Sequence, residues 1–241
     1  MSYNDKRITC IIPARMSSGR FPGKPLAKIN GRELVLRVAD IATKSLYIDE
    51  IIIATEDEVI AKLAEDNGYT AMITGTHYTC THRVAEISQN LHTDYIFNLQ
   101  GDEPLTQRKW IDDMIEYGID NEVDVLQSSR ELEEGEVEDE DVVKMVVNNN
   151  RVTHMQRKCD VICDNICTQL GLYLYSIDAI RKFPDLDMTF VKYWKGLDTI
   201  GFCGKYDVVP FDLKCGKIRA VDRTWHIQEV EWLLQMQKDS N

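Results

Sequence analysis

Short apolar runs alternate with amphipathic segments through the first hundred residues. Residues 7–12 and 50–54 are rich in isoleucine and other apolar side chains, as is typical of strands buried on both faces of a parallel sheet. The same reasoning predicts strands at 71–73 and 95–99. Between these runs, apolar positions recur at helical spacing, which predicts helices over 34–42, 59–67 and 83–91, the second ending at Gly68.

This alternation of strand and helix predicts the fold class. Repeated βα units build a doubly wound α/β sheet with helices on both faces. In such sheets the ligand binds outside the carboxyl ends of the strands. Ligand-binding residues are therefore expected in the segments that follow each predicted strand.

The second half of the chain has a less regular pattern. We predict strands at 142–147, 170–175, 208–211 and 218–221, and a last helix that begins after Thr224 as N-cap and contains Val230, Leu233 and Leu234. Residues 131–141 are mostly acidic and are interpreted as a solvated loop. The chain has no internal repeat and no linker, so residues 1–241 are predicted to form one domain with an inserted sub-region.

Composition and charge exclude several partners. The 241 residues are 44% hydrophobic and 28% charged, an ordinary globular balance, with a formal net charge of −12. No basic excess is available for a nucleic acid or an anionic membrane surface, so an anionic ligand must be held by local Lys and Arg. The sequence has no signal-like N-terminus and no long apolar run, which predicts a cytoplasmic protein.

The seven cysteines are odd in number and scattered, as expected of reduced thiols. Cys159, Cys163 and Cys167 recur every four residues, a spacing that on a helix places three thiolates on one face. There is no second cluster or paired histidine to complete a structural zinc site, so the pattern favours ordinary thiols.

The segment after the first predicted strand concentrates positive charge. Residues 12–26 contain Arg15, Arg20 and Lys24 among small residues whose backbone N–H groups can approach an anion. Gly23 and the flanking prolines predict a fixed turn that directs Lys24 inward. An ordinary basic surface loop is the alternative, but three cations together in an acidic chain favour a triphosphate site.

Two carboxylates follow predicted strands and are candidates for a metal site. Asp102 comes just past the strand at 95–99, with Gly101 beside it to admit a ligand, and Asp222 follows the predicted strand at 218–221. Magnesium prefers one or two carboxylates together with phosphate oxygens and water. The alternative for Asp102 is a residue that only caps the next helix. The pair predicts a Mg2+ site beside the phosphates.

Four stretches together resemble a known family. Residues 11–26, 52–58, 79–86 and 98–105 are similar to the 3-deoxy-manno-octulosonate cytidylyltransferases, with specific motifs at the strand ends. The resemblance implies a Rossmann-like, mixed-sheet fold of the nucleotide-diphospho-sugar transferase type. It further implies a homodimer that transfers CMP from CTP to an acidic sugar, releases pyrophosphate and uses Mg2+. Residues 1–125 are then the nucleotide-binding half, and 126–241 the acceptor and dimerisation half.

The resemblance also implies roles for individual residues. The expected catalytic residues are Arg15, Lys24 and Asp102, and the expected metal ligands are Asp102 and Asp222. The expected nucleotide-binding residues are Pro13, Ala14, Arg15, Lys24, Thr55, Arg83 and Gln100. The expected acceptor-binding residues are Gln100, Arg157, Gln169 and Tyr193.

The departures from the family pattern fall mainly in the acceptor half. The family Ser-Gly-Thr-Asp-Arg loop is here Thr79 to Arg83, without the glycine and the acidic residue, so base selectivity is open. Gln169 replaces a histidine, and aromatic and basic residues at 190–195 replace a glutamate-rich helix. We therefore expect an acceptor related to, but differently substituted from, 3-deoxy-manno-octulosonate.

Other functions stay open on the sequence. One is a nucleotidyltransferase with another base or another acceptor, such as a nonulosonic acid; another is a non-catalytic nucleotide-binding homologue. An NAD-dependent dehydrogenase is disfavoured because the first turn lacks Gly-x-Gly-x-x-Gly. No nucleophile or general base stands out. Four histidines are interpreted as surface or structural residues, the second being the best candidate for chemistry: His77, His82, His154 and His226.

Overall fold

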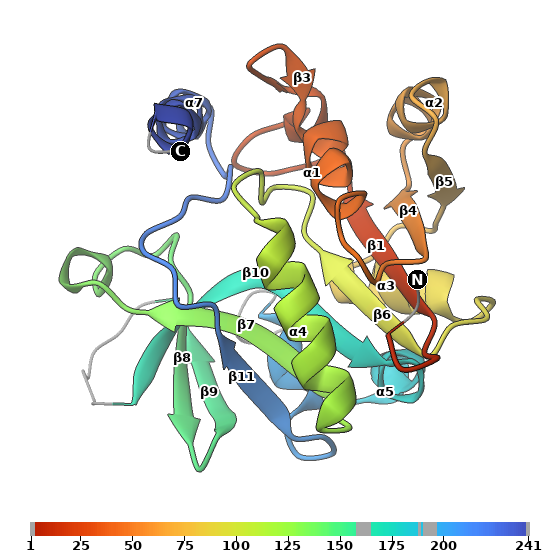
Figure 1. The fold of residues 1–241 in the computed structure, drawn as a ribbon, viewed down its shortest axis with the longest axis vertical. Helices are drawn as coiled ribbons and strands as arrows, with labels where there is room; N and C mark the ends of the chain where they lie inside the picture. The colour runs from red at the N-terminus through yellow and green to blue at the C-terminus, as the bar shows by residue number, and fades with distance from the viewer. Residues whose placement is uncertain (1–2, 158–164, 188, 190–196, 240–241) are drawn as a thin grey trace.

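The computed structural model describes residues 3–157, 165–187, 189 and 197–239. A single nine-stranded sheet runs through both halves of the chain, and its main path has the order β11-β7-β10-β6-β1-β4-β5. Its parallel part comprises β1 (Ile8–Ala14), β4 (Glu50–Thr55), β5 (Thr70–Ile73) and β6 (Tyr95–Leu99) (Figure 1). The doubly wound, mixed α/β sheet predicted from the sequence is confirmed.

Helices cover both faces of this sheet, as β-strands buried on both faces require. One face packs on α1 (Leu34–Ala42) and α4 (Arg108–Asp120), and the opposite face packs on α3 (Cys80–Ser88) and α5 (Ile177–Lys182). The helix α2 (Glu58–Asp66) buries Ile60 and Ala64 in the same core as α1. The C-terminal helix α7 (His226–Asp239) adds Val230 to that core.

The second half extends the sheet with antiparallel pairing. The long strand β10 (Ile166–Ser176) runs antiparallel to β6 and to β7 (Val125–Glu131), and β11 (Val208–Asp212) pairs parallel with β7. The hairpin of β8 (Lys144–Asn148) and β9 (Arg151–Gln156) joins the outer part of β10. A two-stranded sheet of β2 (Lys28–Ile29) and β3 (Arg32–Glu33) precedes α1.

The predicted elements of the first half are confirmed to within a few residues, whereas the second half brings corrections. Residues 218–221 are irregular backbone, not a strand. The last helix begins at His226, so Thr224 lies one residue too early to be its N-cap. The acidic stretch 131–141 is not uniformly solvated, because it contains a 3-10 helix, Glu134–Glu136, and the buried side chain of Glu136.

Sequence reasoning overlooked six helices and strands: α4, α5, β2, β3, β7 and β9. The charged residues of α4 mask a buried stripe of Trp110, Ile111, Met114 and Ile115. The strand β7 buries polar side chains, Gln127, Ser128 and Ser129, so it has no apolar alternation to detect. Among the described residues, none of the helices has both the length and the apolar character needed to cross a bilayer.

Candidate active site

The loop after β1 holds its lysine by a fixed turn. Gly23 has φ +75°, a left-handed conformation that favours glycine, and Pro25 follows inside the 3-10 helix Lys24–Leu26. The predicted turn is confirmed. Lys24 is thereby directed to the carboxyl edge of the sheet, where only 13% of its side chain is exposed.

Lys24 lies between the two carboxylates predicted to bind metal. Its Nζ donates to Asp102 Oδ2 at 2.6 Å and lies 3.6 Å from Asp222 Oδ1. Burial lowers the pKa of Lys24, but Asp102 and Asp222 more than offset this, so the pKa is raised and the ammonium keeps its charge. Burial and the neighbouring Asp102 raise the pKa of Asp222. Cation and carboxylates therefore form one electrostatic unit.

Asp222 reaches this place from a loop rather than from a strand end. The N–H of Val221 donates to the carbonyl of Asp102 at 2.8 Å, and the N–H of Asp222 donates to His226 Nδ1 at 3.1 Å. Arg20 bonds Asp222 and Asp141, each at 2.7 Å. The Asp141 carboxylate also accepts from Arg223. These contacts hold the basic loop against the C-terminal segment.

Gly101 has a packing reason that the sequence did not suggest. A Cβ at this position would lie 2.9 Å from the backbone oxygen of Pro13. The glycine thus allows the β6 end to approach the β1 end closely, rather than simply admitting a ligand as predicted. This approach brings Asp102 next to the basic loop.

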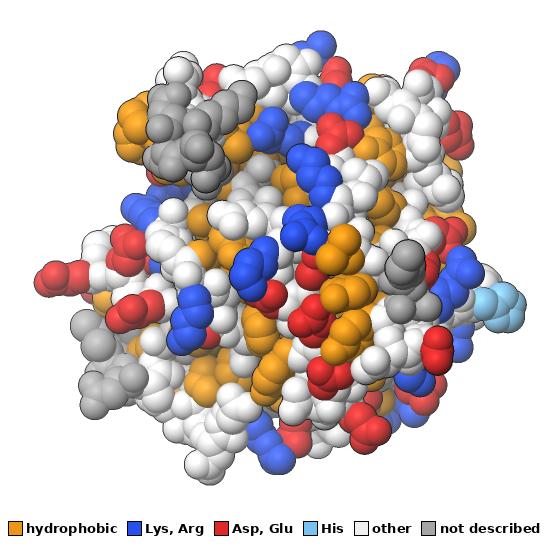
Figure 2. Space-filling view, in the orientation of Figure 1, with side chains coloured by type: hydrophobic (Ala, Val, Ile, Leu, Met, Phe, Trp, Pro, Cys, Tyr) orange, Lys and Arg blue, Asp and Glu red, His pale blue; other side chains and the backbone are white. Residues whose placement is uncertain are grey.

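The larger of two adjoining cavities opens above these strand ends, with a volume of about 540 Å³. Its lining includes six predicted nucleotide-binding residues: Pro13, Ala14, Arg15, Lys24, Arg83 and Gln100. Arg15 is exposed there and, within the described ranges, forms no salt bridge. On the face that carries α1 and α4, Figure 2 shows a band of Lys and Arg side chains with acidic side chains on both sides of it. We call the cavity of about 540 Å³ the outer cavity.

Two of the seven predicted nucleotide-binding residues, Arg83 and Thr55, are held by hydrogen bonds to protein partners. Arg83 is buried, donates from Nε to Thr74 Oγ1 at 2.9 Å and lies 3.3 Å from Glu56, so its guanidinium forms part of the cavity wall. Thr55 is fully buried and does not line the outer cavity. Its hydroxyl accepts from the N–H of Asp57, whose carboxylate accepts from the N–H of Met16. Thr55 thus supports the basic loop from below.

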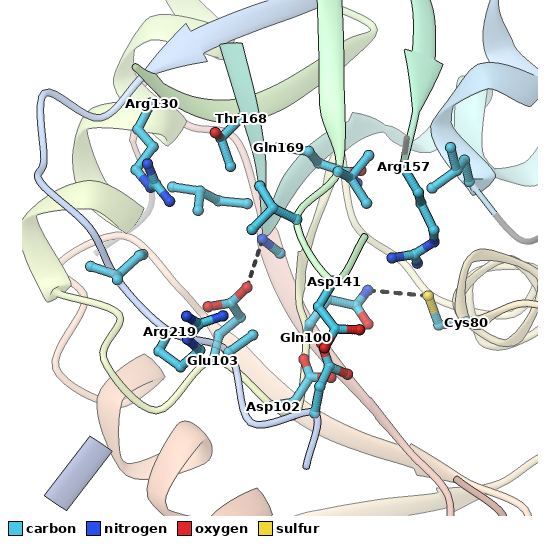
Figure 3. Close-up of a pocket in the computed structure, with 18 of the residues that line it drawn as sticks. Cys80, Gln100, Asp102, Glu103, Arg130, Asp141, Arg157, Thr168, Gln169 and Arg219 are labelled. Atoms are coloured by element: carbon cyan, nitrogen blue, oxygen red, sulfur yellow. Dashed lines mark hydrogen bonds between the residues drawn. The ribbon is translucent and has the colours of Figure 1, made fainter. Parts of the chain in front are cut away.

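The smaller cavity, of about 210 Å³, lies beside the first, and we call it the inner cavity (Figure 3). Seven residues line both: Arg20, Cys80, Gln100, Asp102, Arg157, Asp198 and Asp222. Two compartments therefore meet at the Asp102 and Asp222 carboxylates. This geometry suits a reaction between two bound substrates.

Arg157 and Gln169, two predicted acceptor residues, line the inner cavity. Arg157 donates to the backbone oxygen of Glu140 and, in the part of the chain that the structure describes, pairs with no carboxylate. Buried Lys144 donates to the backbone oxygen of Arg157 at 2.7 Å and so fixes this segment. Gln169 donates to the hydroxyl of Tyr173 at 2.7 Å.

Gln100 lines both cavities and belongs to a hydrogen-bonded chain. Its amide donates to Cys80 Sγ at 3.2 Å, and the Cys80 thiol donates to Asp198 Oδ2 at 3.3 Å. Asp198 also accepts from the N–H of Thr81, which anchors the start of α3. Burial and the nearby Asp198 carboxylate raise the pKa of Cys80, so this thiol is not an activated nucleophile.

Several lining residues escaped sequence reasoning: Glu103, Arg130, Asp141, Thr168, Asp198 and Arg219. Most of these residues lie in irregular segments or at polar positions of β7 and β10, and they belong to no recognisable sequence motif. Glu103 alone carried a signal, as the neighbour of Asp102 in the same strand-end motif. Burial and then Asp102 raise the pKa of Glu103 to about 8.

The remaining predictions concern Tyr193, the spaced cysteines and the histidines. Tyr193, Cys159 and Cys163 lie outside the described residues, whereas Cys167 lies on strand β10 and not on a helix. His82 bonds Thr79 Oγ1 at 2.8 Å and packs against Phe183. His77 bonds Glu86, and His226 accepts from the backbone of Asp222. The described linings of the two cavities include no histidine.

The donor set at Asp102 and Asp222 fits a magnesium ion. Both carboxylates converge on a single point, now taken by the Lys24 ammonium, and supply hard oxygen ligands. Among the described residues there is no group of three or more His, Cys, Asp or Glu side chains able to hold a metal alone. Two carboxylates completed by phosphate oxygens and water are a usual magnesium arrangement.

A doubly wound α/β sheet with two adjoining cavities outside its strand ends is the architecture of the nucleotide-binding α/β proteins. A family model described as cytidylyltransferase matches residues 9–197. The 3-deoxy-manno-octulosonate cytidylyltransferase of Anaeromyxobacter sp. (strain Fw109-5) is 34% identical over 190 residues, which covers 75% of this chain and 78% of the relative. That of Geotalea uraniireducens (strain Rf4) is 31% identical over 215 residues, covering 80% and 85%.

The fold has a close counterpart among solved structures. A CMP:2-keto-3-deoxy-manno-octonic acid synthetase complexed with CTP superimposes with a TM-score of 0.87 at 23% identity, covering 96% of this chain and 99% of that chain. This likeness shows the fold, and the family model with the two relatives shows the family. The chain belongs to the cytidylyltransferase family, and it is a nucleotidyltransferase.

Proposed function

We propose that this enzyme transfers CMP from CTP to 3-deoxy-manno-octulosonate or a closely related 2-keto sugar acid, with release of pyrophosphate. The observation that carries the proposal is the junction of the two cavities at Asp102 and Asp222. In support, the relatives above are named for cytidylyl transfer to 3-deoxy-manno-octulosonate. The outer cavity is assigned to CTP and the inner cavity to the sugar acid.

The chemistry is an in-line displacement at the α-phosphorus. A hydroxyl oxygen of the sugar acid forms the new O–P bond, the bond between the α-phosphorus and the bridging oxygen breaks, and pyrophosphate leaves with that electron pair. The hydroxyl proton passes to solvent. Catalysis rests on positioning and on neutralising charge, because the described site contains no activated nucleophile.

Different residues bind the triphosphate, the nucleotide, the sugar acid and the metal ion. Arg15 and Lys24 neutralise the triphosphate, while Pro13, Ala14 and Gln100 line the nucleotide. Arg157, the cation of the inner cavity left without a carboxylate partner among described residues, binds the carboxylate of the sugar acid. Asp102 and Asp222 would hold Mg2+, which when bound supplies charge neutralisation for the phosphate oxygens.

The test is a pyrophosphate-release assay with product analysis by mass spectrometry. Purified protein receives CTP, Mg2+ and 3-deoxy-manno-octulosonate, with parallel reactions containing ATP, GTP or UTP and reactions containing a chelator. We expect pyrophosphate and a CMP-sugar from CTP alone, lost on chelation. CTP binding without pyrophosphate release from any sugar acid would instead identify a non-catalytic homologue.

We also propose that the enzyme works as a homodimer, as the family resemblance implies. Light scattering coupled to size-exclusion chromatography measures the mass directly. A mass of about 28 kDa, that of one chain, would contradict this proposal.

A further inference from the structure

The inner cavity contains buried polar groups that the transfer reaction does not use. Glu103, Arg130 and Thr168 line it and are 5%, 2% and 3% exposed. One atom of each is buried without a hydrogen-bond partner among the described residues: Glu103 Oε2, Arg130 Nε and Thr168 Oγ1. Native proteins rarely leave such atoms unpaired, so this cluster points to a bound polar partner.

The three side chains come from different elements and are firmly placed. Arg130 and Thr168 are direct partners in the β7–β10 pairing, and Glu103 follows β6. The N–H of Gly171 donates to Glu103 Oε1 at 2.9 Å, which leaves Oε2 as the open atom. In Figure 3 the Arg130 guanidinium and the Glu103 carboxylate extend toward each other across the cavity. The groups therefore form a preorganised polar wall.

The charges on this wall favour a neutral ligand group over an anion. Both terminal nitrogens of Arg130 donate to the buried Glu136 carboxylate, at 2.6 and 2.8 Å, so that cation is already neutralised. Arg219, which also lines the inner cavity, lies 3.3 Å from Glu229. What remains are donors and acceptors without a free positive charge, and a hydroxyl group, which both donates and accepts, matches them.

Position within the cavity indicates which part of the ligand is bound. Glu103, Arg130 and Thr168 line the inner cavity but not the outer one, whereas Asp102 and Gln100 line both. The reacting hydroxyl of an acceptor must lie at the junction, next to the phosphates. The opposite end of the acceptor therefore faces the polar wall.

We propose that Glu103, Arg130 and Thr168 form a specificity subsite that binds the hydroxyls on the carbon tail of the sugar acid, remote from the reacting hydroxyl. The subsite rests on the proposed function of the inner cavity. It selects acceptors by tail length, because a shortened acceptor leaves the buried polar atoms unpaired. Sites of this kind reject analogues that lack the matching group by large factors.

The experiment compares 3-deoxy-2-keto sugar acids of eight and six carbons as acceptors. It uses the intact enzyme, the Thr168→Val variant, and Thr9→Val as a matched control. Valine keeps the β-branched shape and removes only the hydroxyl. Thr9 is also a fully buried threonine whose Oγ1 has no hydrogen-bond partner among the described residues, but it lines neither cavity. Thermal melting and the KM for CTP report whether each variant is folded and binds nucleotide.

We expect the wild type to favour the eight-carbon acceptor in kcat/KM by at least tenfold. Thr168→Val should lose about tenfold with the eight-carbon acceptor and leave the six-carbon acceptor unchanged, and Thr9→Val should keep the wild-type preference. An equal loss with both acceptors, or no loss with either, would overturn the subsite and leave the proposed function standing. No turnover by the wild type with any acceptor would overturn the proposed function, and the subsite with it.

Discussion

At the junction of the cavities, one side chain can have both a structural and a chemical role. Lys24 neutralises Asp102 and Asp222 in the structure and is also the cation expected to meet the triphosphate. Arg15 pairs with no carboxylate in the part of the chain that the structure describes, and its side chain is exposed at the outer cavity. The two cations therefore differ in what their removal should do.

Removing the Lys24 ammonium should reduce catalysis sharply. Lys24→Ala loses a buried charge beside the phosphates, and we expect kcat/KM for CTP to fall at least tenfold, equivalent to about 1.4 kcal/mol. The control is Lys28→Ala, four residues away, whose side chain is 63% exposed and pairs with Glu33. Steady-state kinetics that are the same for wild type and Lys24→Ala would remove Lys24 from the site.

Asp102 should be essential for metal-dependent turnover. Asp102→Asn keeps the size of the side chain but removes the charge that binds Mg2+, so we expect a folded protein with a loss of at least a hundredfold in kcat, about 2.7 kcal/mol. Asp113→Asn is the control, because Asp113 is a half-buried aspartate of α4 that is paired with Lys109. A crystal with CTP and Mg2+ in which the ion touches neither Asp102 nor Asp222 would end this assignment.

The buried pair of Arg130 and Glu136 should matter for stability. Glu136→Gln leaves the Arg130 charge buried without a partner, and breaking a buried pair in this way costs about 3 kcal/mol. Glu134→Gln, two residues away and exposed, should change stability by less than about 0.5 kcal/mol. Urea denaturation measures both.

The same pair gives a pH dependence with a defined sign. Although burial raises the pKa of Glu136, its bonds with Arg130 more than offset this and lower the pKa overall. The unfolded state then takes up the proton first, so the stabilising effect is complete above the ordinary glutamate pKa and is lost as the pH falls below about 4.5. The stability difference between wild type and Glu136→Gln should shrink over that acid range. A difference that stays constant down to pH 3 would contradict this account.

At the scale of elements, the bulge in β10 joins the sheet to the inner cavity. The register with β7 shifts between Gln169 and Tyr173, and Gly171 within this region approaches the β6 end closely. A Cβ at Gly171 would lie 2.6 Å from Glu103 Oε1 and 2.9 Å from Gln100 Cγ. Because Gly171 has no side chain, the strand can lie close to Glu103 and Gln100, which both line the inner cavity.

Gly171→Ala should displace both neighbours. We expect a loss of about 1–3 kcal/mol in stability, typical of overpacking, together with a rise in the KM for the sugar acid. Gly135→Ala is the control, because a Cβ there meets no atom within 4 Å. Wild-type melting temperature and acceptor KM in Gly171→Ala would show that the backbone relaxes without cost.

Across the whole molecule, a net charge of −12 coexists with a cationic site for an anionic substrate. The cations expected to contact the phosphates lie in the loop after β1. Most of the carboxylates near them are paired with arginine or lysine. In the sequence, the departures from the family pattern fall mainly in the half expected to bind the acceptor, at Gln169 and beyond, although the Thr79 to Arg83 loop also differs.

That uneven departure predicts the preferred acceptor. We expect a sugar acid related to 3-deoxy-manno-octulosonate but differently substituted, such as an amino sugar acid or a nonulosonic acid, to have the highest kcat/KM. Gln169 offers a neutral amide that both donates and accepts, where the family has histidine. The measurement is kcat/KM across a panel of these acids. A clear preference for 3-deoxy-manno-octulosonate, at rates typical of good enzymes, would refute the expectation.

The sequence by itself determined the parallel half of the sheet, the basic loop after β1 and the carboxylate after β6. These features depend on local signals: apolar runs form buried strands, Gly23 permits a positive φ, and charged residues follow strand ends. Such signals are contained in a few neighbouring residues and need no knowledge of distant contacts.

Only the tertiary structure decided how the second half completes the site. Asp222 meets Asp102 through a backbone hydrogen bond from Val221, not through the strand predicted before it. The polar wall of Glu103, Arg130 and Thr168 is assembled from the strands β7 and β10 and the loop after β6, which are far apart in the chain. In the sequence these polar residues look like solvent-facing positions. Buried polar groups leave no periodic pattern along the chain, because the hydrogen-bond partner of such a group can be distant in the sequence.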